Sequence, residues 1–173
     1  YDFLNLFKKK YLKGKRCQAY MLRMRIEQNG LRSSNIHDLD KLLKNFDSDY
    51  QYLFSKLFEF EKASELEQND LQMIYPYPNL ARRVLETFLS FRFPSKTDLQ
   101  AKINAVSSPS ITKDLKESVY RFVNFQSHGG IGDTQGFATG VLEPSAKEHI
   151  LNVIKIMRSE DEVHCREMEE SIK

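Results

Sequence analysis

The amino-acid sequence predicts a mainly α-helical bundle that carries one small β-hairpin near its N-terminus. The chain has 173 residues, 40% of them hydrophobic and 29% charged, which suits one domain with a substantial core. Apolar residues recur at helical spacing through most of the sequence. Asn29-Gly30 is a strong hairpin turn signal, and it separates two short segments with strand character.

The first 36 residues should form a helix followed by the hairpin. Apolar residues at helical spacing predict a first helix that ends near Gly14. Mixed apolar and polar residues over 17–26 predict the first strand, and 31–36 the return strand.

Downstream of the hairpin the spacing of apolar residues predicts helices only. Proline and small polar residues mark the boundaries, and a polar joint is expected at 65–70. We expect Ser110 to cap the helix of Arg121, and Ser159 with Glu162 to form a capping box. Glycine-rich residues 129–140 suggest a flexible loop. The predicted helices cover 38–46, a segment around 52–60 capped by Asp47 or Ser48, 78–93, 98–106, 114–128, 144–158 and a last helix to about 172.

Charge and cysteine usage give weaker information about partners and location. The net charge of +2 is too small to argue for a nucleic-acid partner. A basic run crowds the start, and it is most simply a solvated surface, with phosphate binding as the alternative. Two isolated cysteines, Cys17 and Cys165, favour a reducing cytoplasm. The basic run consists of Lys8, Lys9, Lys10, Lys13, Lys15 and Arg16.

Several classes of site and location are disfavoured by the sequence. No apolar run approaches the ~20 residues that span a bilayer, so no membrane partner is expected. No complete phosphate-binding loop or dinucleotide fingerprint is present. His149, His164 and Cys165 are spread over two predicted helices, whereas zinc needs converging ligands, so no metal site is expected.

The predicted helix 114–128 contains the first candidate site. Arg121 and His128 are seven residues apart, almost two turns, so they share one helix face with Asn124 between them. A cation that binds phosphate then lies beside a side chain that titrates near neutral pH, which metal-free RNA cleavage requires. The alternatives are a histidine that merely ends a helix and an Arg121–Glu117 surface ion pair.

The predicted helix 78–93 contains a second candidate pair. Arg82 and Glu86 are i,i+4 neighbours on its polar side, with Arg83 beside them. The simplest interpretation is a surface ion pair worth about 0.3–0.5 kcal/mol.

Several segments in the same order resemble the C-terminal region of ABC-type ATPases of the PrrC/RloC class. The resemblance covers most of the chain. It rests on Tyr1-Asp-Phe-Leu-Asn-Leu-Phe7 with the following basic run and strand, Asp47-Ser-Asp-Tyr-Gln-Tyr-Leu-Phe54, Tyr77-Pro-Asn-Leu-Ala-Arg-Arg-Val-Leu-Glu-Thr-Phe-Leu89 and Arg121-Phe-Val-Asn-Phe-Gln-Ser-His128.

The resemblance implies a HEPN-like helical ribonuclease attached to an ATPase head. The class includes tRNA anticodon nucleases, whose site pairs an Arg and a Glu separated by three residues with a downstream His. Arg82, Glu86 and His128 match that pattern, and Arg121 with His128 fits the looser HEPN pattern. Two departures are Phe122, where a polar residue is common, and Arg83, which competes with Arg82 for the match.

The resemblance also assigns parts and partners. Residues 1–36 would be the tail of the ATPase head and 37–173 the HEPN-like domain. ATP and Mg²⁺ would bind only in the upstream ATPase part, so this chain itself needs no cofactor. A homodimer is implied, because HEPN-like sites usually form across two copies. Arg83, Lys8, Lys9 and Lys10 are the expected RNA contacts.

Three functions follow as hypotheses. The first is a metal-independent endoribonuclease that cuts tRNA as a toxin in antiviral defence, with products ending in a 2′,3′-cyclic phosphate. The second is a non-catalytic structural or dimerisation end of an ATPase in defence or on DNA. The third is a plain nucleic-acid-binding module that uses the basic run.

Overall fold

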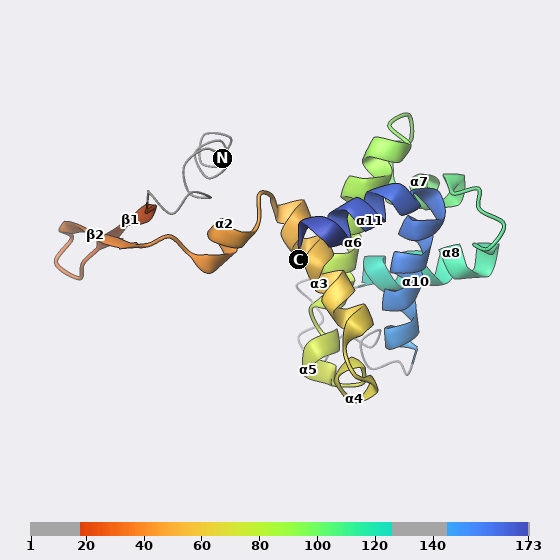
Figure 1. Ribbon diagram of the computed structural model, residues 1–173, viewed down its shortest axis with the longest axis horizontal. Helices are drawn as coiled ribbons and strands as arrows, with labels where there is room; N and C mark the ends of the chain where they lie inside the picture. Colours follow the sequence, from red (N-terminus) through yellow and green to blue (C-terminus); the bar gives the residue numbers. More distant parts are fainter. Residues whose placement is uncertain (1–17, 126–144, 173) are drawn as a thin grey trace. The chain divides into compact units, whose positions relative to one another are not determined.

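The computed structural model describes residues 18–125 and 145–172, and the chain divides into two compact units, 1–49 and 50–173 (Figure 1). We expected a division after residue 36, and the contacts instead separate the units between Asp49 and Tyr50. The assignment of residues 1–36 to an ATPase tail and 37–173 to a HEPN-like domain stays a prediction.

The first unit contains the predicted hairpin. Strand β1 (Tyr20–Ile26) pairs antiparallel with β2 (Arg32–Asp38). Gly30 has a φ of 79°, a left-handed conformation that glycine adopts without steric cost and that the turn requires. The return strand runs two residues beyond the predicted 31–36, because the ladder continues until Asp38 pairs with Tyr20.

A short helix follows the hairpin. Helix α2 (Lys41–Asn45) begins after Asp40, whose Oδ1 accepts a hydrogen bond from the backbone N–H of Leu42 at 2.9 Å. The prediction of a helix over 38–46 was therefore too long at its start, because Asp38 still belongs to β2.

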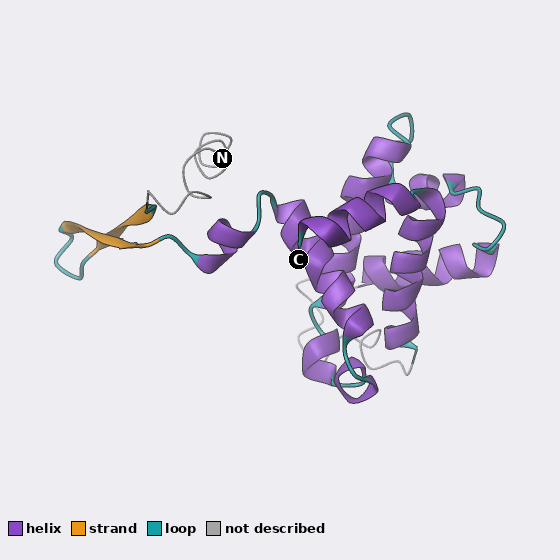
Figure 2. Cartoon of the chain, viewed as in Figure 1, coloured by secondary structure: helices purple, strands orange, loops and turns teal. Residues whose placement is uncertain are grey.

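The second unit is entirely helical in the part that the structure describes, which confirms the predicted fold class (Figure 2). Most predicted helices appear within a few residues of their expected bounds. The helices after α2 are α3 (Asp49–Lys62), α4 (Glu65–Gln68), α5 (Leu71–Ile74), α6 (Tyr77–Arg92), α7 (Leu99–Ala105), α8 (Lys113–Phe125), α10 (Ala146–Glu160) and α11 (Glu162–Ser171). The short helices α4 and α5 were not predicted. The helix predicted before Gly14, residues 126–128 of the predicted helix 114–128 and the predicted loop 129–140 lie outside the described residues.

The predicted polar joint at 65–70 is largely the short helix α4. Its N-cap Ser64 and Glu67 form a reciprocal capping box, in which each side chain satisfies the other's backbone N–H. Hydrogen bonds from the Ser64 hydroxyl and the Ser64 backbone N–H to the Glu67 carboxylate lower the pKa of that carboxyl, because they stabilise its charged form.

Two of the predicted caps were wrong. Thr112, not Ser110, caps α8: its Oγ1 accepts from the backbone N–H of Leu115 at 3.2 Å. Asp161, not Ser159, caps α11: its Oδ1 accepts from the N–H of His164 at 2.8 Å. In both cases the capping residue lies two residues later than expected, directly before the first residue of the helix, and its side-chain oxygen accepts from a free N–H group of the first turn.

Helix α6 is the central element of the second unit. It packs against α7, α8 and α10, and its apolar face is fully buried. Phe93 ends it, directly before Pro94, as the sequence predicted. The buried residues of α6 are Tyr77, Pro78, Ala81, Val84, Leu85, Phe88 and Leu89.

The other helices complete one continuous core around α6. Helix α8 contributes Val119 and Phe122, and α10 contributes Ile150 and Ile154. Burying each such aliphatic or aromatic side chain stabilises the fold by about 1.5–3 kcal/mol. The core therefore holds α6, α7, α8 and α10 in fixed positions. Polar side chains at the contacts between these helices are held in fixed positions for the same reason.

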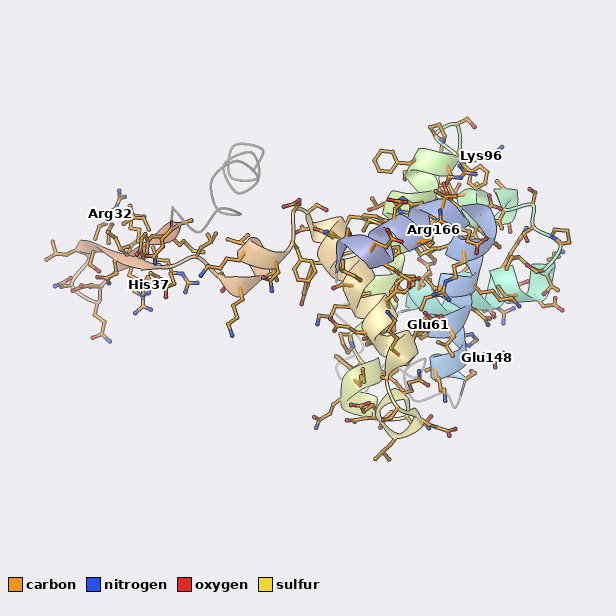
Figure 3. The ribbon with its side chains drawn as sticks, in the orientation of Figure 1. Arg32, His37, Glu61, Lys96, Glu148 and Arg166 are labelled. Carbon is orange, nitrogen blue, oxygen red and sulfur yellow. The ribbon has the colours of Figure 1, made fainter. Side chains whose placement is uncertain are left out.

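A cluster of ion pairs that does not include α6 joins the helices α3, α10 and α11. The guanidinium of Arg158 on α10 donates to Glu61 on α3, labelled in Figure 3, and to Glu169 on α11. The pKa of Arg158 is raised, first by its hydrogen bond to Glu61. This cluster fixes the last helices against α3.

Candidate functional site

One face of α6 carries a strip of polar side chains at helical spacing. Arg82, Glu86 and Ser90 follow one another every four residues, so they lie along one side of the helix. Arg82 Nε donates to Glu86 Oε1 at 2.8 Å. The two side chains are 26% and 43% exposed, so the pair is partly sheltered from water.

Helix α8 supplies the partner that turns this pair into a network between helices. Arg82 Nη1 donates to Asn124 Oδ1 at 2.7 Å, and Asn124 Nδ2 donates to Tyr120 Oη at 3.2 Å. Asn124 is held there because Val119 and Val123, on the adjacent face of α8, are buried in the core. Within the described residues, the guanidinium of Arg82 is thus bonded through two of its nitrogens to side chains on two helices.

Helix α7 extends the strip at its other end. Lys102 Nζ donates to Ser90 Oγ at 2.8 Å, and Ser90 Oγ donates to the carbonyl of Glu86. Lys102 is half-buried, and among the described residues no carboxylate lies within ion-pair distance of its ammonium group. The strip therefore carries two cations, Arg82 and Lys102, and one carboxylate, Glu86.

Arg121 lies outside this network. Its Nη2 donates to Glu117 Oε1 at 2.5 Å, one turn earlier on α8, and its side chain is 74% exposed. The hydrogen bond from Arg121 lowers the pKa of Glu117 and raises that of Arg121. The surface ion pair considered from the sequence is therefore present, and no hydrogen bond links Arg121 to Asn124 in the described part of the chain.

The remaining predicted residues divide into one exposed residue and four outside the described parts. Arg83 is exposed on α6, so Arg82 rather than Arg83 is the arginine on the side of α8. His128, Lys8, Lys9 and Lys10 lie outside the described residues.

Three residues of the network were not predicted. Tyr120 and Ser90 each lie four residues from a predicted residue, so helical spacing could have found them. Lys102 is on a separate helix, and no spacing rule connects it to Ser90. Only the packing of α7 against α6 brings the two side chains together.

The histidines on α10 and α11, His149 and His164, each lie within hydrogen-bond distance of a hydroxyl group. His164 Nε2 lies 2.8 Å from Tyr50 Oη, and its ring packs against Phe54 and Phe88. His149 Nε2 lies 3.1 Å from Ser145 Oγ. Within residues 18–125 and 145–172, no group of His, Cys, Asp and Glu side chains is placed to hold a metal ion, and no helix is long and apolar enough to cross a bilayer.

Comparison with known proteins gives one clear result. The chain matches the family model described as an AAA domain over residues 1–155. No curated protein and no solved structure matches it. The match covers most of the 173 residues, including the hairpin, α6 and α8. The chain therefore belongs to the AAA domain family and is a region related to AAA-type ATPases.

Proposed function

We propose that this chain is the C-terminal effector part of an ABC-type ATPase and that its helical unit is a metal-independent endoribonuclease. The observation that carries the proposal is the network of Arg82, Glu86 and Asn124, which spans α6 and α8. A guanidinium anchored on two elements is preorganised to stabilise charge on a phosphoryl group. The Arg–Glu spacing is also the one that the PrrC/RloC resemblance implies.

The proposed reaction is transfer of an RNA phosphoryl group to its own 2′-oxygen. The 2′-hydroxyl attacks phosphorus and loses its proton, the bond from phosphorus to the 5′-oxygen breaks, and that oxygen takes up a proton. His128 is proposed to handle one or both protons, since imidazole titrates near neutral pH. Arg82 stabilises the phosphoryl oxygens, and Glu86 orients the guanidinium or shares the proton transfer.

Asn124 acts in this proposal by positioning Arg82. In the sequence it precedes His128 by four residues, which is about one turn of the helix predicted over 114–128. Arg121, with its exposed pairing to Glu117, has the weaker claim to touch the reacting phosphate. It suits an outer contact to the RNA backbone, as do Arg83, Lys8, Lys9 and Lys10.

The wider context is also proposed. The substrate is tRNA, the setting is the cytoplasm during defence against phage, and the active form is a homodimer. ATP and Mg²⁺ would bind in an ATPase part outside this sequence. The hairpin supports the proposal of a neighbouring ATPase part. One face of the hairpin exposes apolar side chains that another part of a protein would cover. These are Tyr20, Leu22, Met24, Ile26 and Ile36, each more than half exposed.

The direct test is cleavage of total tRNA by the purified chain in the presence of EDTA. Wild type should cut RNA and leave 2′,3′-cyclic phosphate ends, detected by end-group analysis. His128→Ala should reduce the rate by about 10²–10⁴-fold, the usual contribution of a general acid or base. His37→Ala, a change in the first unit, is the matched control and should keep full activity.

Two results would contradict the proposal. One is intact tRNA after incubation with folded, dimeric wild type. The other is equal cleavage by wild type and His128→Ala, which would point to a contaminating nuclease. Growth gives a second readout, since expression of wild type should be toxic and expression of His128→Ala should not.

The alternative is a non-catalytic structural or dimerisation end of an AAA-type ATPase. The observation that favours it is that Arg82 already bonds to Glu86 and Asn124, so the network could serve only to join α6 to α8. In that case Arg82→Ala would lower stability without any change in RNA, and both growth tests would give healthy cells.

A further inference from the structure

We propose that Lys102 and Ser90 form a second phosphate subsite, and that the substrate is therefore a single-stranded RNA segment several nucleotides long. This inference rests on the proposed function, because it extends the strip that contains Arg82. It adds a residue on a third helix, α7, to a site otherwise built from α6 and α8.

The length of the strip indicates how many nucleotides it could contact. Arg82 and Ser90 are eight residues apart on α6, which corresponds to about 12 Å along the helix axis. The ammonium group of Lys102 is held at the Ser90 end by its 2.8 Å hydrogen bond. We assign the two cations to different phosphates of one strand. At 3.4 Å of rise per nucleotide in a stacked strand, about 12 Å corresponds to three or four nucleotides.

The chemistry at the Ser90 end favours an anion. The ammonium group has three N–H donors, and the bond to Ser90 uses one of them. Lys102 is partly buried on α7, so its charge is less screened than that of a lysine in open solvent. Among the described residues its ammonium group has no carboxylate partner, whereas Arg82 has Glu86. A phosphate is the anion that a polynucleotide would offer there.

The competing explanation is that Lys102 only joins α7 to α6. Its bond to Ser90 does connect the two helices, and a purely structural lysine would have the same geometry. The two explanations differ in what happens to RNA binding, in particular to its dependence on salt and on RNA length.

The experiment measures binding of fluorescein-labelled 2′-O-methyl RNA, which cannot undergo attack by the 2′-oxygen, at several KCl concentrations. Two ligands are compared: a dinucleotide with one phosphate and an octanucleotide with seven. Wild type, Lys102→Ala, Lys102→Arg and Lys155→Ala are assayed by fluorescence anisotropy. Lys155 is the matched control, because it is exposed on α10 among residues whose apolar face is buried in the core.

If Lys102 binds a phosphate, Lys102→Ala should weaken octanucleotide binding about fivefold at low salt and leave dinucleotide binding unchanged. The slope of log K against log salt should fall by about 0.7, the value for one phosphate contact on a single strand. Lys102→Arg should restore both quantities, and Lys155→Ala should match wild type.

Equal octanucleotide affinity and salt slope in wild type and Lys102→Ala would overturn the inference. So would equal weakening of both RNA lengths, which would mean a general loss of structure. Failure of the proposed function can be distinguished from failure of this inference. A salt slope that depends on Lys102, without any cleavage of tRNA, would support the RNA-binding subsite and contradict the nuclease. Cleavage of an unmodified octanucleotide of the same sequence by wild type, with an unchanged kcat/KM in Lys102→Ala, would support the nuclease and contradict this subsite.

Discussion

Two Arg–Glu pairs with the same four-residue separation behave differently in this protein. On α6, Arg82 and Glu86 are 26% and 43% exposed, and Arg82 also bonds to Asn124 of α8. On α8, Arg121 and Glu117 are 74% and 51% exposed, and their bond stays within one helix. A third partner on another helix is the difference between them.

The comparison shows why spacing alone cannot identify a site. An exposed pair on one helix is mobile and screened, so it contributes little to stability or to ligand orientation. A guanidinium tied to two packed helices keeps its direction, because moving it would require the helices to move. Of these two pairs, the one on α6 is preorganised in this way, and the following predictions test that distinction.

The largest expected difference is catalytic. Arg82→Ala should reduce tRNA cleavage by about 10²–10³-fold, as for loss of a preorganised donor that stabilises developing charge. Arg121→Ala should change the rate by less than about threefold, because its partner and its exposure mark a surface group. Single-turnover cleavage in EDTA measures both rates. Equal losses in the two variants would remove the distinction between the pairs.

The next difference concerns stability. Asn124→Ala removes the acceptor of a charge-assisted hydrogen bond and should lower the free energy of unfolding by about 2 kcal/mol. Asn104→Ala, at an exposed position of α7, is the control and should have little effect. Urea unfolding followed by circular dichroism gives both values. If Asn124→Ala is as stable as wild type, the network between helices does not hold α6 to α8.

A smaller effect is expected at high pH on the buried side of α6. Burial raises the pKa of Tyr77 to about 12, and its hydroxyl donates to the carbonyl of Lys56 at 2.9 Å. The unfolded tyrosine ionises near pH 10, so this contribution is complete below pH 10 and is lost as the pH rises to about 12. At pH 11 the loss should be about 1 kcal/mol.

Tyr77→Phe should therefore show a flatter decline of stability between pH 9 and pH 11 than wild type. Tyr75→Phe is the control, because Tyr75 is 51% exposed. Urea midpoints at pH 9, 10 and 11 decide the result. Parallel declines in wild type and Tyr77→Phe would show that Tyr77 does not carry the effect. Burial also raises the pKa of Tyr50. Its effect on stability is the same in wild type and in Tyr77→Phe, so it does not change the difference between them.

The smallest effect is expected at the exposed pair. The hydrogen bond from Arg121 lowers the pKa of Glu117, so any stabilisation is present above the unfolded pKa and is lost as the pH falls through the folded one. Because Glu117 is exposed, Glu117→Gln should have the same Tm as wild type at every pH between 7 and 3. A clear fall in Tm at pH 7 that disappears by pH 3 would show that this pair is as important as the one on α6.

Part of the site could be predicted from the sequence. The helix from Tyr77 to Arg92 follows from its apolar spacing and from Pro94, and the i,i+4 rule pairs Arg82 with Glu86. Spacing left Arg83 as a competitor, because it lies three residues before Glu86 on the same polar side of the helix. The bond to Asn124 made the choice between Arg82 and Arg83, because it depends on how α8 crosses α6.

The sequence by itself determined the local elements: the hairpin at Asn29-Gly30, the helical second unit and the arginine–glutamate pairs. These depend on backbone preference and on neighbours within one turn, which a single segment contains. The tertiary structure alone decided which pair became a network and brought Lys102 to Ser90. Side chains on different helices meet only where the core fixes the position of one helix against another.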